Sequence, residues 1–224
     1  MNIEQARFNM VEQQIRPWDV LDAKILDLLF VVRREDFVPE AWRTLAFADL
    51  EVPLGQGVTM LSPKMEARML QELDIAKTDR ALEVGTGSGY VAALLGELAA
   101  KVTTVEIQPA LAKAAAARLA THAANRLAAG KVIDVTVVEG DGATDWADGA
   151  PFDVILVSGA LAEVPAGLLT RLAEGGRLLA VIGDAPVMRA TLFTRTPAGV
   201  RSGVLFETVI APLRNAQQPE RFTF

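Results

Sequence analysis

Apolar residues in the first part of the chain recur at the spacing of one helix face. Four of them follow this period: Leu21, Ile25, Leu28 and Leu29. The pattern predicts a helix over residues 20–32, and Asp19 is expected to be its N-cap. A shorter helix is predicted upstream, ending at residues 16–19, where a proline interrupts the chain.

Residues 39–57 contain several prolines and glycines and show no clear period. This composition predicts a long irregular stretch, and such stretches in compact domains are usually functional. Ser62 and Pro63 follow it as the expected N-cap and first residue of another helix. Apolar positions continue that helix through Leu73.

From residue 80 onward, short apolar runs alternate with helical patterns. The runs predict strands at residues 81–84, 101–107, 132–138, 152–158 and 177–182. Helices are expected at residues 90–98 and 109–129, and around residues 168–172. Strands that alternate with helices in this way imply a parallel sheet with right-handed crossovers.

Two further apolar runs, at residues 188–196 and 204–212, flank turn residues 197–199 and predict an antiparallel hairpin at a sheet edge. We therefore expect a doubly wound, Rossmann-like α/β fold with a mostly parallel sheet, an N-terminal helical extension and a C-terminal hairpin. The whole chain, 1–224, is expected to be a single domain. Its parts are the helices and irregular loop at 1–78, the core at 79–185, and the hairpin and tail at 186–224.

The composition narrows the possible chemistry. The chain has 224 residues, a formal charge of −6 and no cysteine. Without cysteine there are no disulfides, thiolate nucleophiles or zinc–thiolate sites, and no metal is expected. The negative charge argues against a general electrostatic attraction to nucleic acid. His122, the single histidine, lies in an alanine-rich helical pattern and is expected to be a solvated surface residue.

No window reaches the roughly 18 uninterrupted apolar residues expected of a membrane span. The first residues also lack the apolar core of a signal peptide. A cytoplasmic protein without a membrane or nucleic-acid partner is therefore expected, while the oligomeric state is not indicated by the sequence.

Three glycines, Gly85, Gly87 and Gly89, lie between a predicted strand and a predicted helix. Such a loop can turn tightly and let a ligand lie directly on the backbone. The dinucleotide fingerprint G-x-G-x-x-G requires glycine at position 90, where this chain has Tyr90. Beginning at Glu83, the segment instead resembles the E/D-x-G-x-G-x-G loop of class I methyltransferases, which bind S-adenosylmethionine. A plain tight turn is the alternative interpretation.

Acidic residues follow the next two predicted strands. Glu106 ends the second strand about 20 residues after the loop, where a carboxylate can accept both ribose hydroxyls. Asp141 and Gly142 follow the third strand, where the carboxylate can receive the adenine amino group. Taken singly, Glu106 could be a surface acid and Asp141 part of a turn. However, the carboxyl ends of successive parallel strands converge on one crevice.

The candidate cofactor-binding residues are therefore Glu83, Gly85, Thr86, Gly87, Ser88, Gly89, Tyr90, Glu106, Ile107, Asp141 and Gly142. For Glu83, the alternative role is to stabilise the loop by accepting hydrogen bonds from glycine amides.

Several segments outside the loop occur in a characteristic order: Asp36-Phe37-Val38-Pro39, Ala46-Phe47-Ala48-Asp49, Val52-Pro53-Leu54-Gly55, Glu139-Gly140-Asp141-Gly142, Phe206-Glu207-Thr208-Val209 and Ala211-Pro212-Leu213. In this order they resemble the protein-L-isoaspartate O-methyltransferase family nearly end to end. The resemblance implies S-adenosylmethionine-dependent methylation of the free carboxylate of isoaspartyl residues in proteins or peptides, a repair reaction. Since the nucleophile is already a carboxylate, no general base is needed. Proximity and orientation alone can lower the activation free energy by about 7 kcal/mol or more.

One segment departs from the family pattern. The family's substrate loop, T-I-S-x-P, corresponds to Thr59-Met60-Leu61-Ser62-Pro63. Leu61 thus stands where the resemblance implies a serine that positions the substrate carboxylate, and losing such a donor costs about 1–3 kcal/mol. Ser62 is either a compensating donor or only a helix cap, and Thr59 is another candidate donor.

Thr59, Leu61 and Ser62, on the substrate side, are therefore the candidate catalytic residues. Three alternatives remain open. They are a methyltransferase with a different acceptor, a non-catalytic cofactor-binding protein, and an NAD-dependent oxidoreductase, which Tyr90 disfavours.

Overall fold

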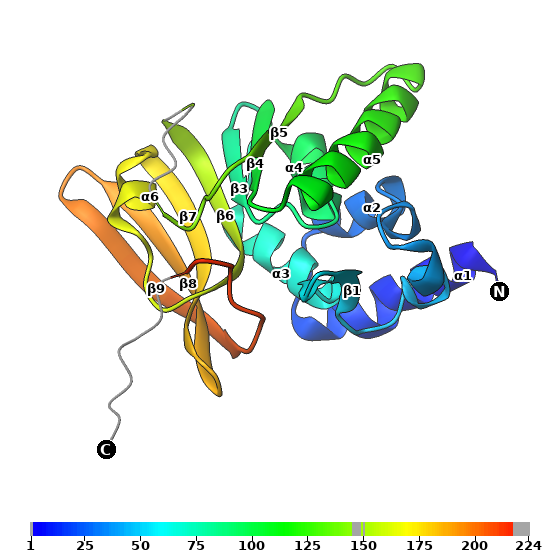
Figure 1. Cartoon of the computed structure of the whole chain (residues 1–224), viewed down its shortest axis with the longest axis horizontal. Coiled ribbons are helices and arrows are strands. Elements are labelled where there is room, and N and C mark those ends of the chain that lie inside the picture. Colours follow the sequence, from blue (N-terminus) through cyan, green and yellow to red (C-terminus); the bar gives the residue numbers. More distant parts are fainter. Residues whose placement is uncertain (1, 145–148, 150, 217–224) are drawn as a thin grey trace.

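The chain contains a seven-stranded sheet in the order β5-β4-β3-β6-β7-β8-β9, with the N-terminal helices to its right in Figure 1. The computed structural model describes residues 2–144, 149 and 151–216, so the end of the predicted tail lies outside the described residues. Strands β3 to β7 pair in parallel, and β8 and β9 are antiparallel to their neighbours. The bounds are β3 (Arg80–Val84), β4 (Lys101–Glu106), β5 (Val135–Glu139), β6 (Phe152–Leu161), β7 (Leu172–Asp184), β8 (Val187–Thr196) and β9 (Gly199–Thr208).

This topology confirms the predicted Rossmann-like fold with a C-terminal antiparallel hairpin. The strand order reverses between β3 and β6, because β4 and β5 extend the sheet on one side of β3 and β6 on the other. Ligands of open α/β sheets bind at such a reversal, beyond the carboxyl ends of the strands.

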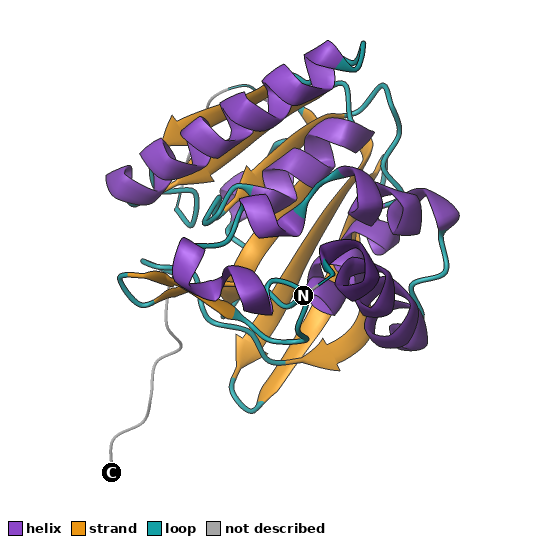
Figure 2. Ribbon diagram, turned by 90° about the vertical axis from the view of Figure 1, so that its right-hand side faces the viewer, coloured by secondary structure: helices purple, strands orange, loops and turns teal. Residues whose placement is uncertain are grey.

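Most helices gather on one face of the sheet, in front of the strands in Figure 2. The helical elements are α1 (Ile3–Asn9), a π-helical turn (Met10–Ile15), a 3₁₀ turn (Arg16–Trp18), α2 (Ala23–Val31), two further 3₁₀ turns (Arg34–Asp36 and Glu40–Leu45), α3 (Pro63–Leu73), α4 (Tyr90–Leu98), α5 (Pro109–Ala128) and α6 (Ala166–Thr170). The predicted helix at 90–98 has the observed bounds of α4.

Alternate residues of the central strands enter two separate hydrophobic clusters, as the two-residue period of a strand requires. Leu156 and Leu179 face the cluster shared with the helices. Ile155 and Leu178 face a second cluster that is covered by α6. The first cluster also contains Met10 and other buried residues of the N-terminal helices, so these helices and the sheet share one core.

The predicted cap of the second helix is wrong by three residues. Asp22, not Asp19, is the N-cap of α2, and its side chain accepts a hydrogen bond from the backbone N–H of Lys24 at 2.8 Å. Asp19 instead ends the preceding 3₁₀ turn with a left-handed backbone (φ 59°). An aspartate tolerates either position, so residue type alone does not distinguish them.

Part of the predicted irregular stretch is a small antiparallel hairpin. Strands β1 (Val52–Gly55) and β2 (Val58–Met60) pair and are joined by Gln56 and Gly57. Both connecting residues have positive φ, 52° and 74°. A type I′ hairpin turn needs positive φ at both connecting residues. Glutamine is an uncommon residue for this conformation, so the sequence showed none of the usual hairpin turn signals.

The last predicted strand is also displaced. β9 occupies Gly199–Thr208 rather than residues 204–212, because Thr196 pairs with Gly199 across a two-residue turn. Residues 209–216, which we call the C-terminal segment, leave the sheet edge. They return to β6, where the N–H of Leu213 donates a backbone hydrogen bond to the carbonyl of Ala160.

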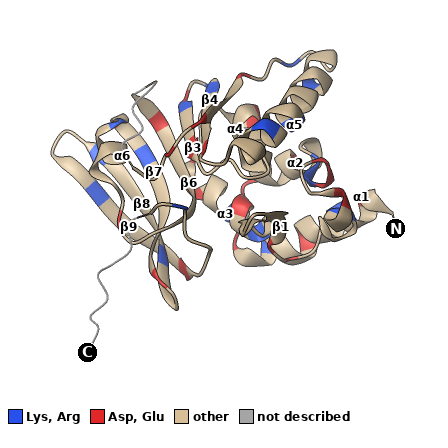
Figure 3. Ribbon diagram, viewed as in Figure 1, with Lys and Arg blue, Asp and Glu red and all other residues tan. Residues whose placement is uncertain are grey.

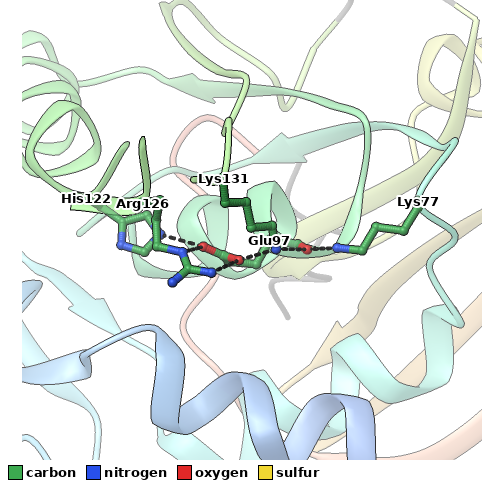
Figure 4. A network of polar contacts seen from close by, with 5 residues as sticks. All are labelled: Lys77, Glu97, His122, Arg126 and Lys131. Carbon is green, nitrogen blue, oxygen red and sulfur yellow. Dashed lines mark hydrogen bonds and ion pairs between the residues drawn. The ribbon is translucent and has the colours of Figure 1, made fainter. Parts of the chain in front are cut away.

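His122 is buried rather than solvated, which corrects the sequence-based expectation. Four side chains converge on Glu97 in Figure 4: Lys77, His122, Arg126 and Lys131. His122 Nε2 lies 3.2 Å from a carboxylate oxygen of Glu97, and Arg126 Nε lies 2.6 Å from the same oxygen. Burial lowers the pKa of His122, so the imidazole is neutral near pH 7. The histidine thus lies at the contact between α4 and α5, beside Glu97.

Charged positions of both signs are interspersed along the helices and strands in the view of Figure 3.

Among the described residues, no helix is both long enough and apolar enough to span a bilayer.

Candidate cofactor and substrate site

The glycine loop begins where β3 leaves the sheet. The backbone N–H groups of Gly85 and Thr86 both donate to the carbonyl of Val105, at 2.9 and 3.2 Å. Gly85 has φ +96°, and a Cβ there would lie 3.0 Å from the side chain of Leu213. The first glycine is therefore required both by its backbone conformation and by the close approach of the C-terminal segment.

Glu106 organises this loop from the end of β4. One carboxylate oxygen accepts the N–H of Gly87 at 2.8 Å, and the other accepts the N–H of Gln108 at 3.0 Å. The side chain is only 4% exposed, yet it lines a cavity. A carboxylate has about four acceptor positions, so these two bonds leave capacity for two hydroxyl donors.

Asp141 and Gly142 lie beyond the end of β5. Asp141 accepts the N–H of Ala143 at 3.0 Å and is contacted by the side chain of Asn215 at 3.4 Å. A Cβ on Gly142 would lie only 2.6 Å from Val84. This spacing is too short for any side chain, so Gly142 lets the loop pack directly on the end of β3.

A cavity connects these three loops with the hairpin β1–β2 and the C-terminal segment. Its empty space is about 740 Å³, including the part that is open to solvent. Small-molecule sites of α/β sheets usually lie in such a concave space at the reversal of strand order. The cavity brings together eight of the predicted site residues: Thr59, Leu61, Gly85, Gly87, Glu106, Ile107, Asp141 and Gly142. An adjoining narrow pocket adds three more: Glu83, Thr86 and Ser88.

Three predicted residues line neither space. Ser62 occupies the N-cap position of α3, but its side chain makes no capping hydrogen bond. Gly89 packs on α5, since a Cβ would lie 3.2 Å from Ala115. Tyr90 is 1% exposed and its ring contacts Phe37 at a centroid distance of 5.5 Å.

Glu83 is fully buried under the glycine loop. Its carboxylate accepts the hydroxyl of Thr104 at 2.7 Å and that of Ser158 at 2.9 Å. Burial raises the pKa of Glu83 to about 8, against the opposing effect of these two hydrogen bonds. Its partners are thus side chains of neighbouring strands rather than the glycine amides that the alternative role required.

The substrate-side wall is held by a buried arginine. Arg34 is 1% exposed, forms an ion pair with Glu66, and donates from Nη2 to the carbonyl of Leu61 at 2.7 Å. Leu61 itself is 7% exposed, and its side chain joins the hydrophobic core. The loop backbone is therefore fixed independently of the side chain at position 61.

Some cavity residues with polar or bulky side chains were not predicted, among them Gln108, Ser158, Leu213 and Arg214. Ser158 and Gln108 lie near the ends of strands, where a systematic search of such positions would have found them. The contribution of Leu213 and Arg214 depends on the return of the C-terminal segment to β6, and no local pattern predicts it.

Comparison with known proteins identifies the family. The model of the protein-L-isoaspartate(D-aspartate) O-methyltransferase family matches residues 5–215. The protein-L-isoaspartate O-methyltransferase of Koribacter versatilis is 40% identical over 193 residues, covering 86% of this chain and 83% of its own length. That of Roseiflexus castenholzii is 39% identical over 213 residues, covering 95% and 94%.

A solved structure agrees in fold. It is described as a putative protein-L-isoaspartate O-methyltransferase from Plasmodium falciparum in complex with S-adenosyl-L-homocysteine. The TM-score is 0.78 at 21% identity, with coverage of 96% of this chain and 99% of that one. With the matching segments and the site geometry, these similarities show that the chain belongs to the protein-L-isoaspartate(D-aspartate) O-methyltransferase family.

Proposed function

We propose that this chain is an S-adenosylmethionine-dependent O-methyltransferase that acts on the free carboxylate of isoaspartyl residues in proteins and peptides. The observation that carries the proposal is the shared cavity. One wall consists of the glycine loop, Glu106 and Asp141, and the other contains Thr59 and Leu61. A methyl donor and an acceptor can therefore meet in one space.

The cavity fits the cofactor on two independent grounds. Both polar atoms of the Gln108 side chain are buried in the cavity wall without a hydrogen-bond partner in the described part of the chain. An amide that needs both a donor and an acceptor suits a nucleoside base, which offers both. The spare acceptor positions of Glu106 suit the two hydroxyls of a ribose.

We assign the cofactor roles accordingly. Glu106 accepts the ribose hydroxyls and Asp141 the adenine amino group, with Ile107 and Gly142 beside the base. The glycine loop, residues 85–89, holds the methionyl part, and Thr86 and Ser88 shape the narrow pocket behind it. Tyr90 and Glu83 support the loop from the interior of the protein, since both side chains are buried.

The chemistry demands little acid–base assistance. S-adenosylmethionine supplies a methyl group on a sulfonium sulfur. A substrate carboxylate oxygen forms the new O–CH₃ bond, the C–S bond breaks, and its electron pair stays on sulfur. No proton moves, so the protein must only exclude water and hold the carboxylate in line.

The hydrophobic core that the N-terminal helices share with the sheet supports treating residues 1–224 as one domain.

A methyl-transfer assay tests this function directly. An isoaspartyl peptide and its aspartyl twin are incubated with the protein, and formation of S-adenosylhomocysteine is followed. We expect turnover of the isoaspartyl peptide only. Equal rates on the two peptides, or none on either while S-adenosylhomocysteine binds, would contradict the proposal.

The apolar Leu61 favours one second candidate, a methyltransferase with a different acceptor. The variant Leu61→Ser separates the two. If position 61 limits recognition of the isoaspartyl carboxylate, the variant gains activity on that peptide. If another group holds the carboxylate, its activity stays close to wild type.

A further inference from the structure

The charges around the cavity are unfavourable for an anionic substrate. Glu106 and Asp141 both line it. Among the described residues that form its walls, Arg214 is the only basic one. A carboxylate that entered without a cationic partner would be repelled by the two acids.

The hydroxyl groups of the cavity are already engaged. Thr59 and Ser158 are the two hydroxyl side chains among its described lining residues. Thr59 donates to Glu51 at 2.7 Å, and Ser158 donates to Glu83 at 2.9 Å. The Thr59 hydroxyl carries one proton, so it cannot also donate to a substrate carboxylate without breaking its bond to Glu51. Ser158 is held by its hydrogen bond with the Glu83 carboxyl group.

Arg214 is placed by a well-anchored stretch of backbone. Two hydrogen bonds of 2.9 Å attach this stretch to β6: Ala160 donates to the carbonyl of Ala211, and Leu213 donates to the carbonyl of Ala160. The Leu213 side chain packs over two glycines, since a Cβ would lie 3.0 Å from it at Gly85 and 2.8 Å at Gly159. The residue before Arg214 is thus fixed at the cavity wall.

The guanidinium of Arg214 extends from this segment to the hairpin β1–β2. Nη2 donates to the carbonyl of Gln56, and it lies 3.6 Å from where a Cβ on Gly57 would be. Within the described residues, Nε and Nη1 make no hydrogen bond. Arg214 is exposed and lines the cavity, so these remaining N–H groups are available to a ligand.

We propose that Arg214 binds the carboxylate of the methyl acceptor and thereby replaces the hydroxyl that Leu61 lacks. The inference rests on the proposed function and names the group that recognises its substrate. A guanidinium donor forms strong, directional hydrogen bonds to a carboxylate. If it holds one oxygen, the other keeps lone pairs that can accept the methyl group.

The test compares Arg214→Met and Arg214→Lys with wild type. Arg201→Met is the matched control, because Arg201 is an exposed arginine on β9, away from the cavity. Calorimetry measures binding of an isoaspartyl peptide, and of its analogue with a neutral carboxamide, to protein saturated with S-adenosylhomocysteine. Steady-state kinetics and the affinity for S-adenosylhomocysteine are measured in parallel.

We expect Arg214→Met to weaken binding of the acidic peptide and raise its KM roughly 10- to 100-fold, as for loss of a hydrogen bond to a charged group. In Arg214→Met the preference for the acidic peptide over the carboxamide should disappear, and the affinity for S-adenosylhomocysteine should not change. Arg214→Lys should keep part of the preference. Adding Leu61→Ser to Arg214→Met should recover part of the lost affinity.

An unchanged preference for the acidic peptide in Arg214→Met would overturn the assignment, and so would an equal loss in Arg201→Met. The two proposals fail separately. Wild-type turnover with an unaffected Arg214→Met refutes only the role of Arg214. Absent wild-type turnover refutes the proposed function, and the binding comparison of acid with carboxamide still decides whether Arg214 recognises carboxylates.

Discussion

The substitution Glu106→Gln tests the cofactor side of the site with almost no change in shape. In the wild type, each carboxylate oxygen of Glu106 accepts one backbone N–H, from Gly87 or from Gln108. Glutamine keeps one acceptor oxygen and replaces the other with an NH₂ group. The backbone N–H of either Gly87 or Gln108 would then point at this NH₂ group, which is also a donor. The loop therefore cannot keep its present geometry.

The magnitude follows from these contacts. An unsatisfied buried donor costs about 1–3 kcal/mol, and hydrogen bonds to a charged group exceed neutral ones by about 1 kcal/mol each. Two ribose hydroxyls and one misplaced amide thus amount to about 3–5 kcal/mol, or roughly a 100- to 4,000-fold loss of affinity for S-adenosylhomocysteine.

Calorimetric titration with S-adenosylhomocysteine measures this loss, and thermal unfolding with and without the ligand gives an independent value. Glu139→Gln is the matched control, because Glu139 pairs with Glu106 in the sheet register at the end of the neighbouring strand but is exposed. A less than threefold change for Glu106→Gln, or a similar loss in both variants, would refute the assigned role.

Three further predictions concern the support of the cavity. Because burial raises the pKa of Glu83 to about 8, the folded chain retains a proton there that the unfolded chain loses near the ordinary glutamate pKa of 4.5. The free energy of unfolding should therefore fall as the pH rises from 4.5 to 8, by up to about 1.4 kcal/mol for each pH unit. In Glu83→Gln, urea titrations should show this fall reduced, and an identical pH dependence would contradict the burial argument. Gly142→Ala places a methyl group 2.6 Å from Val84, so S-adenosylhomocysteine affinity in calorimetry should fall at least about tenfold; wild-type affinity would show that the loop can move away. Leu213→Ala removes the contact over Gly85 and should lower stability by about 1–2 kcal/mol in thermal unfolding, whereas an unchanged midpoint would mean that the C-terminal segment is held by its backbone alone.

The parts of the fold that the sequence predicted are those whose signals are local. The glycine loop is contiguous, and its strand and helix have distinct periods, so the start of α4 at Tyr90 was evident. The convergence of Glu106 and Asp141 also followed from a general rule about parallel strands, and both residues line the observed cavity.

The errors arose where a residue type is compatible with several conformations. Asp19 and Asp22 are equally good caps in sequence, and only the left-handed backbone at Asp19 excludes it. His122 was expected at the surface because its neighbours are alanines. It is instead buried and contacts Glu97 on another helix and the ring of Phe37, and no sequence pattern indicates these contacts.

The two walls of the site differ in the same way. The cofactor wall is built from strand ends and short loops, so motif and topology together locate it. The substrate wall combines residues of the hairpin β1–β2, β6 and the C-terminal segment, which are far apart in the chain. Whether Leu61 abolishes recognition cannot be judged from position 61 alone. The answer depends on whether Thr59 is already bound to Glu51, and on where the chain places Arg214. Both contacts depend on the tertiary structure. Together they imply that the group that binds the substrate carboxylate is the positively charged Arg214, rather than a hydroxyl.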